Sequence, residues 1–343
     1  MNLKLFFLLI VLSPTLIFAQ FGGTHSFQFF DIQVSPKVES LGGSGISLPM
    51  NNDVSLSRLV PSLLNENMNN NFVFAYSDYF SDINILSFSF AKKINKLGLT
   101  SVNIQAINYG FFDYTDEYGN VLGKFSASDQ LFTFSLAKKI SSVFTLGMNL
   151  NLLNSKYSNY SSIVISSNLS STYYNNSNNL CFTILVENIG RQLKKYNRSE
   201  NLPTQIEIAL SKKLKYLPFT YHISYNNLQK FDISSPYKLN NTFNYNTTNS
   251  QSQNESFPKT FLRHLIIGGE LRPFNKNLFL RSGFNFQRRF DMSLSSYPGF
   301  IGFSFGVGVE IVGFMFDYSR SSYHIAGTTN NFSITTNINN FAL

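Results

Sequence analysis

The chain has 343 residues and a formal net charge of +8, with 27 lysines and arginines against 19 aspartates and glutamates. Charged residues make up 13% of it, about half of the roughly 25% usual in soluble domains, while 16% is aromatic and tryptophan is absent. This balance excludes an ordinary charged globule. Beyond the N-terminus, no apolar run approaches the roughly 20 residues that a membrane-spanning helix needs. The remaining class is the transmembrane β-barrel, in which apolar residues alternate with polar ones instead of forming long apolar runs.

The N-terminus predicts a secretory signal peptide over residues 1–19. Lys4 supplies the positive charge, Leu5 to Leu12 forms an apolar core, and Ala19 offers a cleavage point. We expect an N-terminal plug at the periplasmic mouth over residues 20–71 and a transmembrane barrel over residues 72–343.

From Phe72 onward the dominant pattern is an alternation of apolar and polar residues, as in Leu86, Phe88 and Phe90 with Ser87 and Ser89. Successive side chains of a strand point to opposite faces, so each segment has one apolar and one polar face. A soluble sandwich alternates in the same way. The polar face here is mostly Ser, Asn, Gln and Gly, and segments of about ten residues suit a tilted spanning strand, which favours the membrane.

The pattern predicts an all-β fold, a 14-stranded antiparallel transmembrane β-barrel. The expected strands are Phe72–Phe80, Ile83–Lys92, Leu97–Tyr109, Ser126–Lys138, Val143–Asn154, Ser162–Tyr173, Leu180–Gly190, Pro203–Lys212, Pro218–Leu228, Phe261–Arg272, Leu278–Arg288, Phe300–Glu310, Phe314–Tyr323 and Asn331–Phe341.

The connections predict the orientation of this barrel. Lysine pairs at Lys92-Lys93, Lys138-Lys139 and Lys212-Lys213 close the second, fourth and eighth strands, so they share one side. The long connections follow odd-numbered strands and share the other side; they are Gly110–Phe125, Arg191–Leu202 and Gln229–Thr260. Short turns face the periplasm in bacterial barrels and long loops face outside. The low-complexity loop Gln229–Thr260 carries three aromatic residues that are candidates for partner docking: Tyr237, Phe243 and Tyr245.

The sequence offers no catalytic motif. None of the four histidines, His25, His222, His264 and His324, pairs at a metal-ligand spacing, and the single cysteine, Cys181, makes neither a disulfide nor a structural zinc site. We therefore expect no enzymatic activity and no cofactor. The positive charge is scattered rather than gathered in a basic block, so nucleic acid is not an expected partner.

Alternation places several charged residues on the inward face of the strands: Glu187, Glu207, Glu270, Arg272, Arg281, Arg289, Glu310 and Asp317. A buried charge must be paired or hydrogen-bonded. The sequence leaves two interpretations open, an ion-pair network that stiffens the interior and a polar conduit or ligand site.

Two groups of motifs carry a resemblance to known families. Gly42-Gly43, Asp53-Val54 and Pro61–Leu64 resemble the N-terminal plug region of FadL-like barrels, although Val60-Pro61 stands where that family usually has Asn-Pro. A second group resembles the PorQ-like barrels of the Bacteroidota type IX secretion system: Leu202-Pro203, Ser211–Leu214, Leu217–Phe219, Arg263-His264, Gly302–Gly306, Asp317–Arg320, Tyr323–Gly327 and Asn331–Asn337.

The resemblance implies a non-enzymatic component of the cell-surface attachment complex, held in the outer membrane. The implied partners are the lipid bilayer with its lipopolysaccharide, a PorZ-like surface protein, and PorU and PorV in the same complex. A FadL-like transporter of hydrophobic small molecules is the alternative from another class. A dispersed enzymatic site is a third, but it lacks a candidate triad.

Overall fold

The computed structural model describes residues 26–48, 52–80, 83–234, 256–273, 277–293, 299–324 and 327–341. The expected signal peptide and the loop residues Tyr237, Phe243 and Tyr245 lie outside the described residues.

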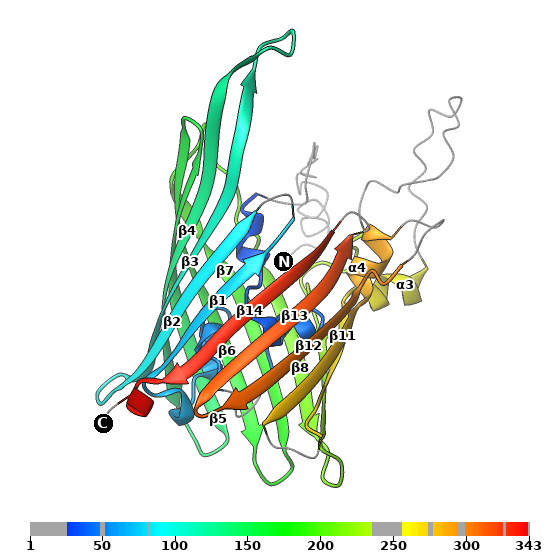
Figure 1. The fold of residues 1–343 in the computed structure, drawn as a ribbon. Helices are drawn as coiled ribbons and strands as arrows, with labels where there is room; N and C mark the ends of the chain where they lie inside the picture. The colour runs from blue at the N-terminus through cyan, green and yellow to red at the C-terminus, as the bar shows by residue number, and fades with distance from the viewer. Residues whose placement is uncertain are drawn as a thin grey trace, which may run out of the picture.

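The strands form one closed antiparallel barrel in which each strand pairs with its sequence neighbours, and β1 pairs with β14 to close the ring (Figure 1). The fourteen strands and the antiparallel fold class predicted from the sequence are confirmed. The strands are β1 Asn71–Asp78, β2 Asn84–Ile94, β3 Gly98–Thr115, β4 Val121–Lys139, β5 Phe144–Tyr157, β6 Tyr160–Asn175, β7 Leu180–Lys194, β8 Gln205–Lys213, β9 Phe219–Tyr225, β10 Leu265–Leu271, β11 Leu278–Asn285, β12 Phe303–Ile311, β13 Phe314–His324 and β14 Gly327–Asn337.

The wall has an apolar outside and a polar inside. On β2, Leu86 and Phe88 are exposed at 48% and 45%, whereas Ser87 and Ser89 between them are buried. The same alternation continues around the ring, and its outer face includes Phe132, Leu150, Ile223, Phe305 and Ile334. Large apolar side chains exposed in this regular way face lipid rather than water, which is the pattern of outer-membrane barrels. Among the described residues, every helix is too short or too polar to traverse a bilayer.

The lysine pairs and the long connections lie at opposite ends of the barrel, as expected. Lys92-Lys93, Lys138-Lys139 and Lys212-Lys213 end β2, β4 and β8, and the antiparallel order brings all three to the end with the short turns. We call this end the periplasmic mouth and the opposite end the outer rim.

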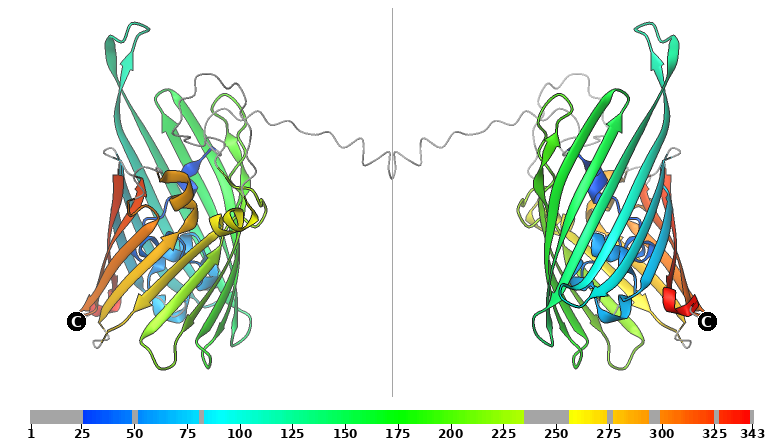
Figure 2. Two further views of the ribbon diagram at one scale, coloured as in Figure 1. Left: turned by 90° about the vertical axis from the view of Figure 1, so that its right-hand side faces the viewer. Right: turned by 90° about the vertical axis from the view of Figure 1, so that its left-hand side faces the viewer.

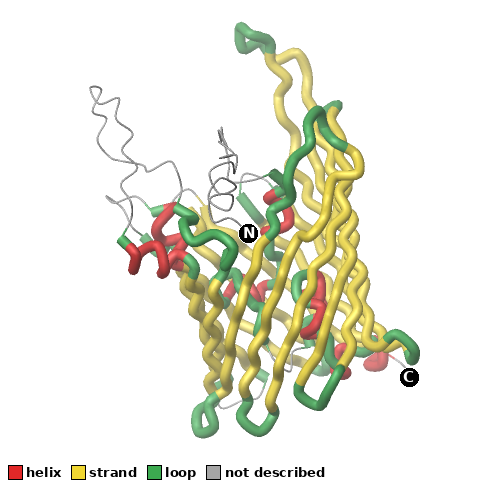
Figure 3. The backbone as a smooth tube through the Cα atoms, turned by 180° about the vertical axis from the view of Figure 1, so that it is seen from behind, coloured by secondary structure: helices red, strands yellow, loops and turns green. Residues whose placement is uncertain are grey.

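The wall is much taller on one side than on the other (Figure 2). Strands β3 to β7 have 14 to 19 residues, whereas β8 to β11 have 7 to 9. Above the short strands, two seven-residue helices lie at the outer rim, α3 (Phe257–Arg263) and α4 (Phe286–Met292), and Figure 3 shows them from behind.

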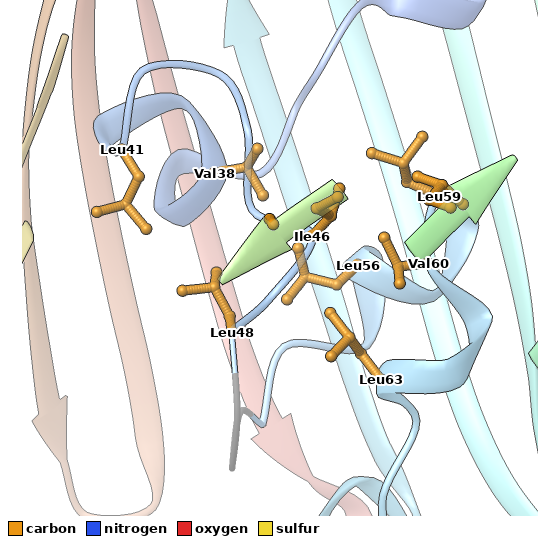
Figure 4. Packing of buried hydrophobic residues seen from close by; sticks show 10 residues of the cluster. Val38, Leu41, Ile46, Leu48, Leu56, Leu59, Val60 and Leu63 are labelled. Carbon is orange, nitrogen blue, oxygen red and sulfur yellow. The ribbon is translucent and has the colours of Figure 1, made fainter. Parts of the chain in front are cut away.

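The N-terminal segment, residues 26–48 and 52–70, lies inside the barrel, and we call it the plug segment. It consists of short helices joined by turns: η1 Gln28–Asp31, α2 Pro36–Ser40, η2 Val54–Arg58, η3 Pro61–Leu63 and η4 Glu66–Met68; η5 (Ile338–Phe341) follows β14. Eight of its apolar side chains pack on one another (Figure 4), with Leu185 and Ala209 contributed by the wall. The segment therefore brings its own small core into a lumen lined by polar groups.

Glycines on the inner face make room for the plug segment. A Cβ atom at Gly283 would overlap the backbone of Leu41 and Gly42, and one at Gly147 would overlap the backbone at Ser62. The backbone next to α2 and in η3 therefore packs directly against the wall backbone, at a distance that only glycine in the wall allows.

Three segments differ clearly from the sequence-based expectation. The connection Gly110–Phe125, expected as a loop, is the upper part of the β3–β4 hairpin. The expected strand starting at Phe261 begins at Leu265, because Phe257–Arg263 is helical with Pro258 in its first turn. Likewise β11 ends at Asn285, whose side chain accepts the backbone N–H of Arg288 and so caps α4.

Candidate functional site

The inner wall holds the plug segment by donating hydrogen bonds to its backbone. Short helices leave carbonyl groups without partners at their ends. Asn149 Nδ2 donates to the Arg58 carbonyl at 2.5 Å, and Ser135 Oγ donates to the Ser57 carbonyl at 2.8 Å. Asn168 Nδ2 reaches the Leu59 carbonyl at 3.2 Å. The Asn- and Ser-rich lumen is thus paired with the polar backbone of the plug segment.

The structure brings four of the predicted lumen residues together in one ion cluster beneath α2. Arg281 Nε lies 2.8 Å from Glu270 Oε2, and Arg281 Nη1 lies 2.5 Å from Asp317 Oδ1. Arg272 Nη2 lies 3.0 Å from Glu270 Oε1, with its guanidinium over the Phe279 ring. The side chain of Arg281 is fully buried, so both of its carboxylate partners are needed to compensate its charge.

The plug segment adds Lys37 and Asp53 to this cluster. Burial lowers the pKa of the Lys37 amine below its usual 10.5, and the nearby carboxylates of Glu270 and Asp317 act in the opposite direction. Because α2 places Lys37 beside the charged side chains of the wall, the cluster joins the plug segment to β10, β11 and β13.

Glu187 and Glu207 lie together in a second buried group, on β7 and β8. Glu207 Oε1 accepts a hydrogen bond from Ser44 Oγ at 2.5 Å, and Glu187 interacts electrostatically with Arg58 of the plug segment. Burial lowers the pKa of the Arg58 guanidinium, and the charges of Glu187 and Asp31 oppose that shift. Both carboxylates of this group therefore face the plug segment.

The remaining two predicted lumen residues lie elsewhere. Glu310 is exposed at the end of β12, where it lines the periplasmic mouth. Arg289 is in α4 at the outer rim, and its guanidinium donates to the carbonyl of Gly299 at 3.0 Å. The expectation that Arg289 points into the lumen is corrected, because the cap at Asn285 turns the chain into a helix before that position.

Two buried carboxylates were not predicted from the sequence. Glu39 of α2 is 1% exposed and accepts hydrogen bonds from Tyr323 Oη at 2.8 Å and from Arg288 at 3.4 Å. It lay in a segment without alternation, so no sequence signal located it. Asp129 is buried on β4 and accepts a hydrogen bond from Tyr109 Oη at 2.7 Å. Its inward direction was available from the alternation of β4.

A cavity of about 560 Å³ opens at the periplasmic mouth. Its lining is mainly polar and comes from the plug segment, β1, β11 to β14 and the turns next to them, including Asn52, Asn71, Glu310 and Asn337. Several of its amides are already paired with one another; for example, Asn337 Nδ2 donates to Asn71 Oδ1 at 2.6 Å. Among the described residues, no three His, Cys, Asp or Glu side chains gather as metal ligands would.

Nearer the outer rim, one row of apolar residues interrupts the polar inner wall on β1 to β6. Phe29, Phe30 and Val34 of the plug segment pack against a belt that crosses β1 to β6. The belt consists of Ala75, Ile85, Ile107, Leu131, Leu153 and Val164, all buried. This belt is the most extensive apolar surface that the described wall turns toward the lumen.

The upper β3–β4 hairpin projects far beyond the outer rim (Figure 1). It leaves the wall at a β-bulge, where Asn108 pairs with Ser128 but Phe111 pairs with Ser126, and where Gly110 has a φ of 81°. Its tip is ordered by Asp116, whose carboxylate accepts hydrogen bonds from Asn120; this bonding lowers the pKa of the carboxyl.

This hairpin exposes large apolar side chains away from the membrane wall. Tyr118 is 90% exposed, Phe111 79% and Leu122 64%, and Phe112, Tyr114 and Val121 are exposed beside them. Asp113, Asp116 and Glu117 outnumber Lys124 among the charged residues here, so the hairpin is acidic. Phe111 and Phe112 are successive strand residues and point to opposite faces, so both faces of the hairpin carry exposed apolar side chains. Large apolar side chains gathered on an exposed segment are typical of a protein-binding site.

No family model matches the chain, and no curated protein matches it in sequence. Several solved structures are similar in fold. The toluene transporter TodX of Pseudomonas putida aligns with 12% identity and a TM-score of 0.49, over 89% of this chain and 97% of that one. A FadL homologue of Pseudomonas aeruginosa aligns with 11% identity and a TM-score of 0.44, over 85% and 95%. The KdgM porin in complex with disordered oligogalacturonate aligns with 6% identity and a TM-score of 0.35, over 78% and 99%.

Proposed function

We propose that this chain is an outer-membrane scaffold that docks a surface protein through its projecting hairpin. The observation that carries the proposal is the β3–β4 hairpin, an ordered arm with Phe111, Tyr118 and Leu122 exposed beyond the outer rim. Aromatic residues are enriched in protein interfaces and give large contact area at low entropic cost. Exposing them in water is unfavourable unless a partner covers them.

The lumen supports a scaffold more than a conduit. The plug segment is joined to the wall by the Arg281 cluster, by Glu207 and by the carbonyl contacts of Asn149 and Asn168. Each of these contacts would have to break before the plug segment could leave. A barrel whose lumen is filled in this way suits the support of a projecting hairpin better than the passage of solutes.

The finer assignment within this proposal is a PorQ-like component of the type IX secretion system. The support is the sequence resemblance, above all the run Asp317–Arg320 to Asn331–Asn337. In this role the barrel holds a PorZ-like surface protein beside PorU and PorV, and so supports the anchoring of secreted cargo to lipopolysaccharide.

A triple substitution of the hairpin tests the docking role. We expect Phe111→Ser/Tyr118→Ser/Leu122→Ser to reduce recovery of the surface partner with the tagged barrel at least tenfold, because the main apolar contacts are removed while the barrel wall is untouched. The measurement is quantitative co-purification from detergent-solubilised outer membranes, with surface anchoring of secreted cargo measured in parallel.

The control is Tyr216→Ser, which removes an equally exposed tyrosine (87%) from a periplasmic turn at the opposite end. Partner recovery with this variant should equal the wild type. Wild-type recovery with the triple variant would reject the hairpin as the docking site. Normal cargo anchoring in a strain lacking the protein would reject the type IX role.

A transporter of hydrophobic molecules is the second candidate, favoured by the apolar belt around Ile107 and Leu131. Displacement of Phe29 and Phe30 would free that belt for an apolar ligand. Loss of labelled fatty-acid uptake in the deletion strain, with cargo anchoring unchanged, would favour this function over the scaffold.

A further inference from the structure

We propose that α3 and α4 form a lipid-contacting platform that completes the membrane belt on the short side of the barrel. The occupant is the acyl-chain and headgroup boundary of the outer leaflet. We call the exposed apolar residues of this region the rim patch: Leu228, Phe231, Phe257, Phe261, Met292 and Phe300.

The height of the short wall requires such an addition. Strands β9 and β10 have 7 residues each. At about 3.3 Å per residue and a tilt of about 40°, they span only about 18 Å, against an apolar band about 25 Å tall in barrels of this kind. The shortfall is about 7 Å, and a helix lying at the rim, about 10 Å in diameter, is wide enough to cover it.

Aromatic contacts connect the lipid-facing wall to α4 without a break. Phe303 and Phe305 face outward on β12 with rings 6.3 Å apart, and Phe303 lies 4.7 Å from Phe284 of β11. Phe284 in turn meets Phe286 of α4 at 4.8 Å, edge to face. The apolar surface of the membrane wall therefore continues onto the helix.

A second series connects the wall to α3. Tyr225, the last residue of β9, lies 5.5 Å from Phe261, and Phe261 stacks with Phe257 at 6.5 Å. Phe257 stacks in turn with Phe231 at 5.5 Å. Phe257 is 68% exposed, although the wall next to it already contacts lipid.

The polar side of the helices faces the protein. Thr260, Arg263 and His264 are buried, and His264 is held by the carbonyl groups of Asn226 and Phe231 at 2.6 and 2.8 Å. Arg263 pairs with Asp291 and so joins α3 to α4. Lys259 lies over the Phe290 ring, with its ammonium 5.4 Å from the ring centre. The polar groups of these helices are thus satisfied within the protein, and the exposed face is aromatic, like the face that an interfacial helix buries in lipid.

Continuity with the wall distinguishes this platform from the β3–β4 hairpin. The rim patch begins where the lipid-facing aromatics of β9, β11 and β12 end, at the level of the short wall. The hairpin projects well beyond that level (Figure 2). Its tip carries Asp116 and Glu117, which suit water or a protein partner rather than lipid. The platform is independent of the proposed docking function.

The absence of tryptophan makes a direct test possible, because one substitution creates a single fluorescent reporter. We would place Phe257→Trp and, separately, Phe300→Trp in the full-length protein, reconstituted in phosphatidylcholine vesicles with or without bromine on the acyl chains. We expect blue-shifted emission that the brominated lipid quenches at least twofold.

Two matched reporters calibrate the result. Phe305→Trp on the lipid-facing wall gives the full quenching, and Tyr118→Trp at the hairpin tip gives the value in water. Heat-modifiable migration in gels confirms that each variant is folded. Quenching of Phe257→Trp and Phe300→Trp close to that of Phe305→Trp supports the platform. Red-shifted, unquenched emission like that of Tyr118→Trp would overturn the platform and would indicate that the rim patch binds a protein partner instead.

Discussion

The substitution Gly283→Val is expected to expel the plug segment while the barrel wall stays folded. The backbone of β11 is extended there and accepts a β-branched residue, so the effect comes from space alone. A Cβ atom would overlap the backbone of Leu41 and Gly42, which cannot move aside as the end of a flexible side chain can. Overpacking of this kind costs about 1–3 kcal/mol or more.

Limited trypsin digestion measures the release. Lys37 and Arg58 of the plug segment are 9% and 7% exposed, so cleavage after them requires the segment to leave the lumen. We expect cleavage at these sites to accelerate at least tenfold in Gly283→Val and in Gly147→Val, which meets the backbone at Ser62. The barrel band itself should remain heat-modifiable.

Gly123→Val is the matched control. This glycine also lies in a strand, on the projecting hairpin, but nothing lies within 4 Å of the Cβ position. Its digestion pattern in the plug segment should equal that of the wild type. Equal protection of Lys37 in Gly283→Val and Gly123→Val would show that the close approach of α2 to the wall does not hold the plug segment.

The barrel was predictable from the sequence because lipid and lumen impose a period of two on every spanning segment. Leu86 and Phe88 had to be apolar and Ser87 and Ser89 had to be polar, so β2 was visible without any contact information. The lysine pairs were visible for the same reason, since charge is tolerated at the turns and costly on the wall.

The hairpin was missed because that constraint ends at the rim. Above the bulge at Gly110 both faces of the hairpin meet the same surroundings, so Phe111 and Phe112 can follow one another and the alternation disappears. What orders this part instead is local: the pairing of Phe112 with Phe125 and the turn organised by Asp116.

The rim helices were also misassigned, although local signals were present. Ser256-Phe257-Pro258 is a helix start, and Asn285 three residues before Arg288 is a cap. Alternating apolar residues on both sides of these sites favoured strands. Arg289 was therefore assigned to the lumen, whereas its guanidinium reaches the carbonyl of Gly299 at the rim.

The pairing of charged side chains inside the lumen was the least predictable part of the site. Alternation gave the inward direction of Glu207, Glu270 and Arg281, but not which of them would meet. That depends on the register between strands and on the path of the plug segment, which brings Lys37 and Ser44 to these charges. A segment of short helices has no periodicity from which such contacts follow.

Removal of the central cation of the lumen should destabilise the whole barrel. Arg281→Met keeps most of the side chain's volume but removes the ion pair of Asp317 with Arg281. Three carboxylates, Glu270, Asp317 and Asp53, are then left opposite only two cations, Lys37 and Arg272. Breaking a buried pair by removing one partner costs about 3–5 kcal/mol, because the remaining charge stays in a region of low dielectric. Guanidinium unfolding of the protein in thin-bilayer vesicles measures this loss.

Restoring the charge balance should recover much of the stability. With Arg281→Met/Asp317→Asn, the cluster retains Lys37 and Arg272 opposite Glu270 and Asp53, so the two signs match again. The exposed pair between Lys93 and Glu66, at 3.0 Å with side chains 48% and 72% accessible, provides the control. Lys93→Met should cost less than about 1 kcal/mol. A similar small loss in Arg281→Met would show that the cluster fills space in the lumen without holding the plug segment to the wall.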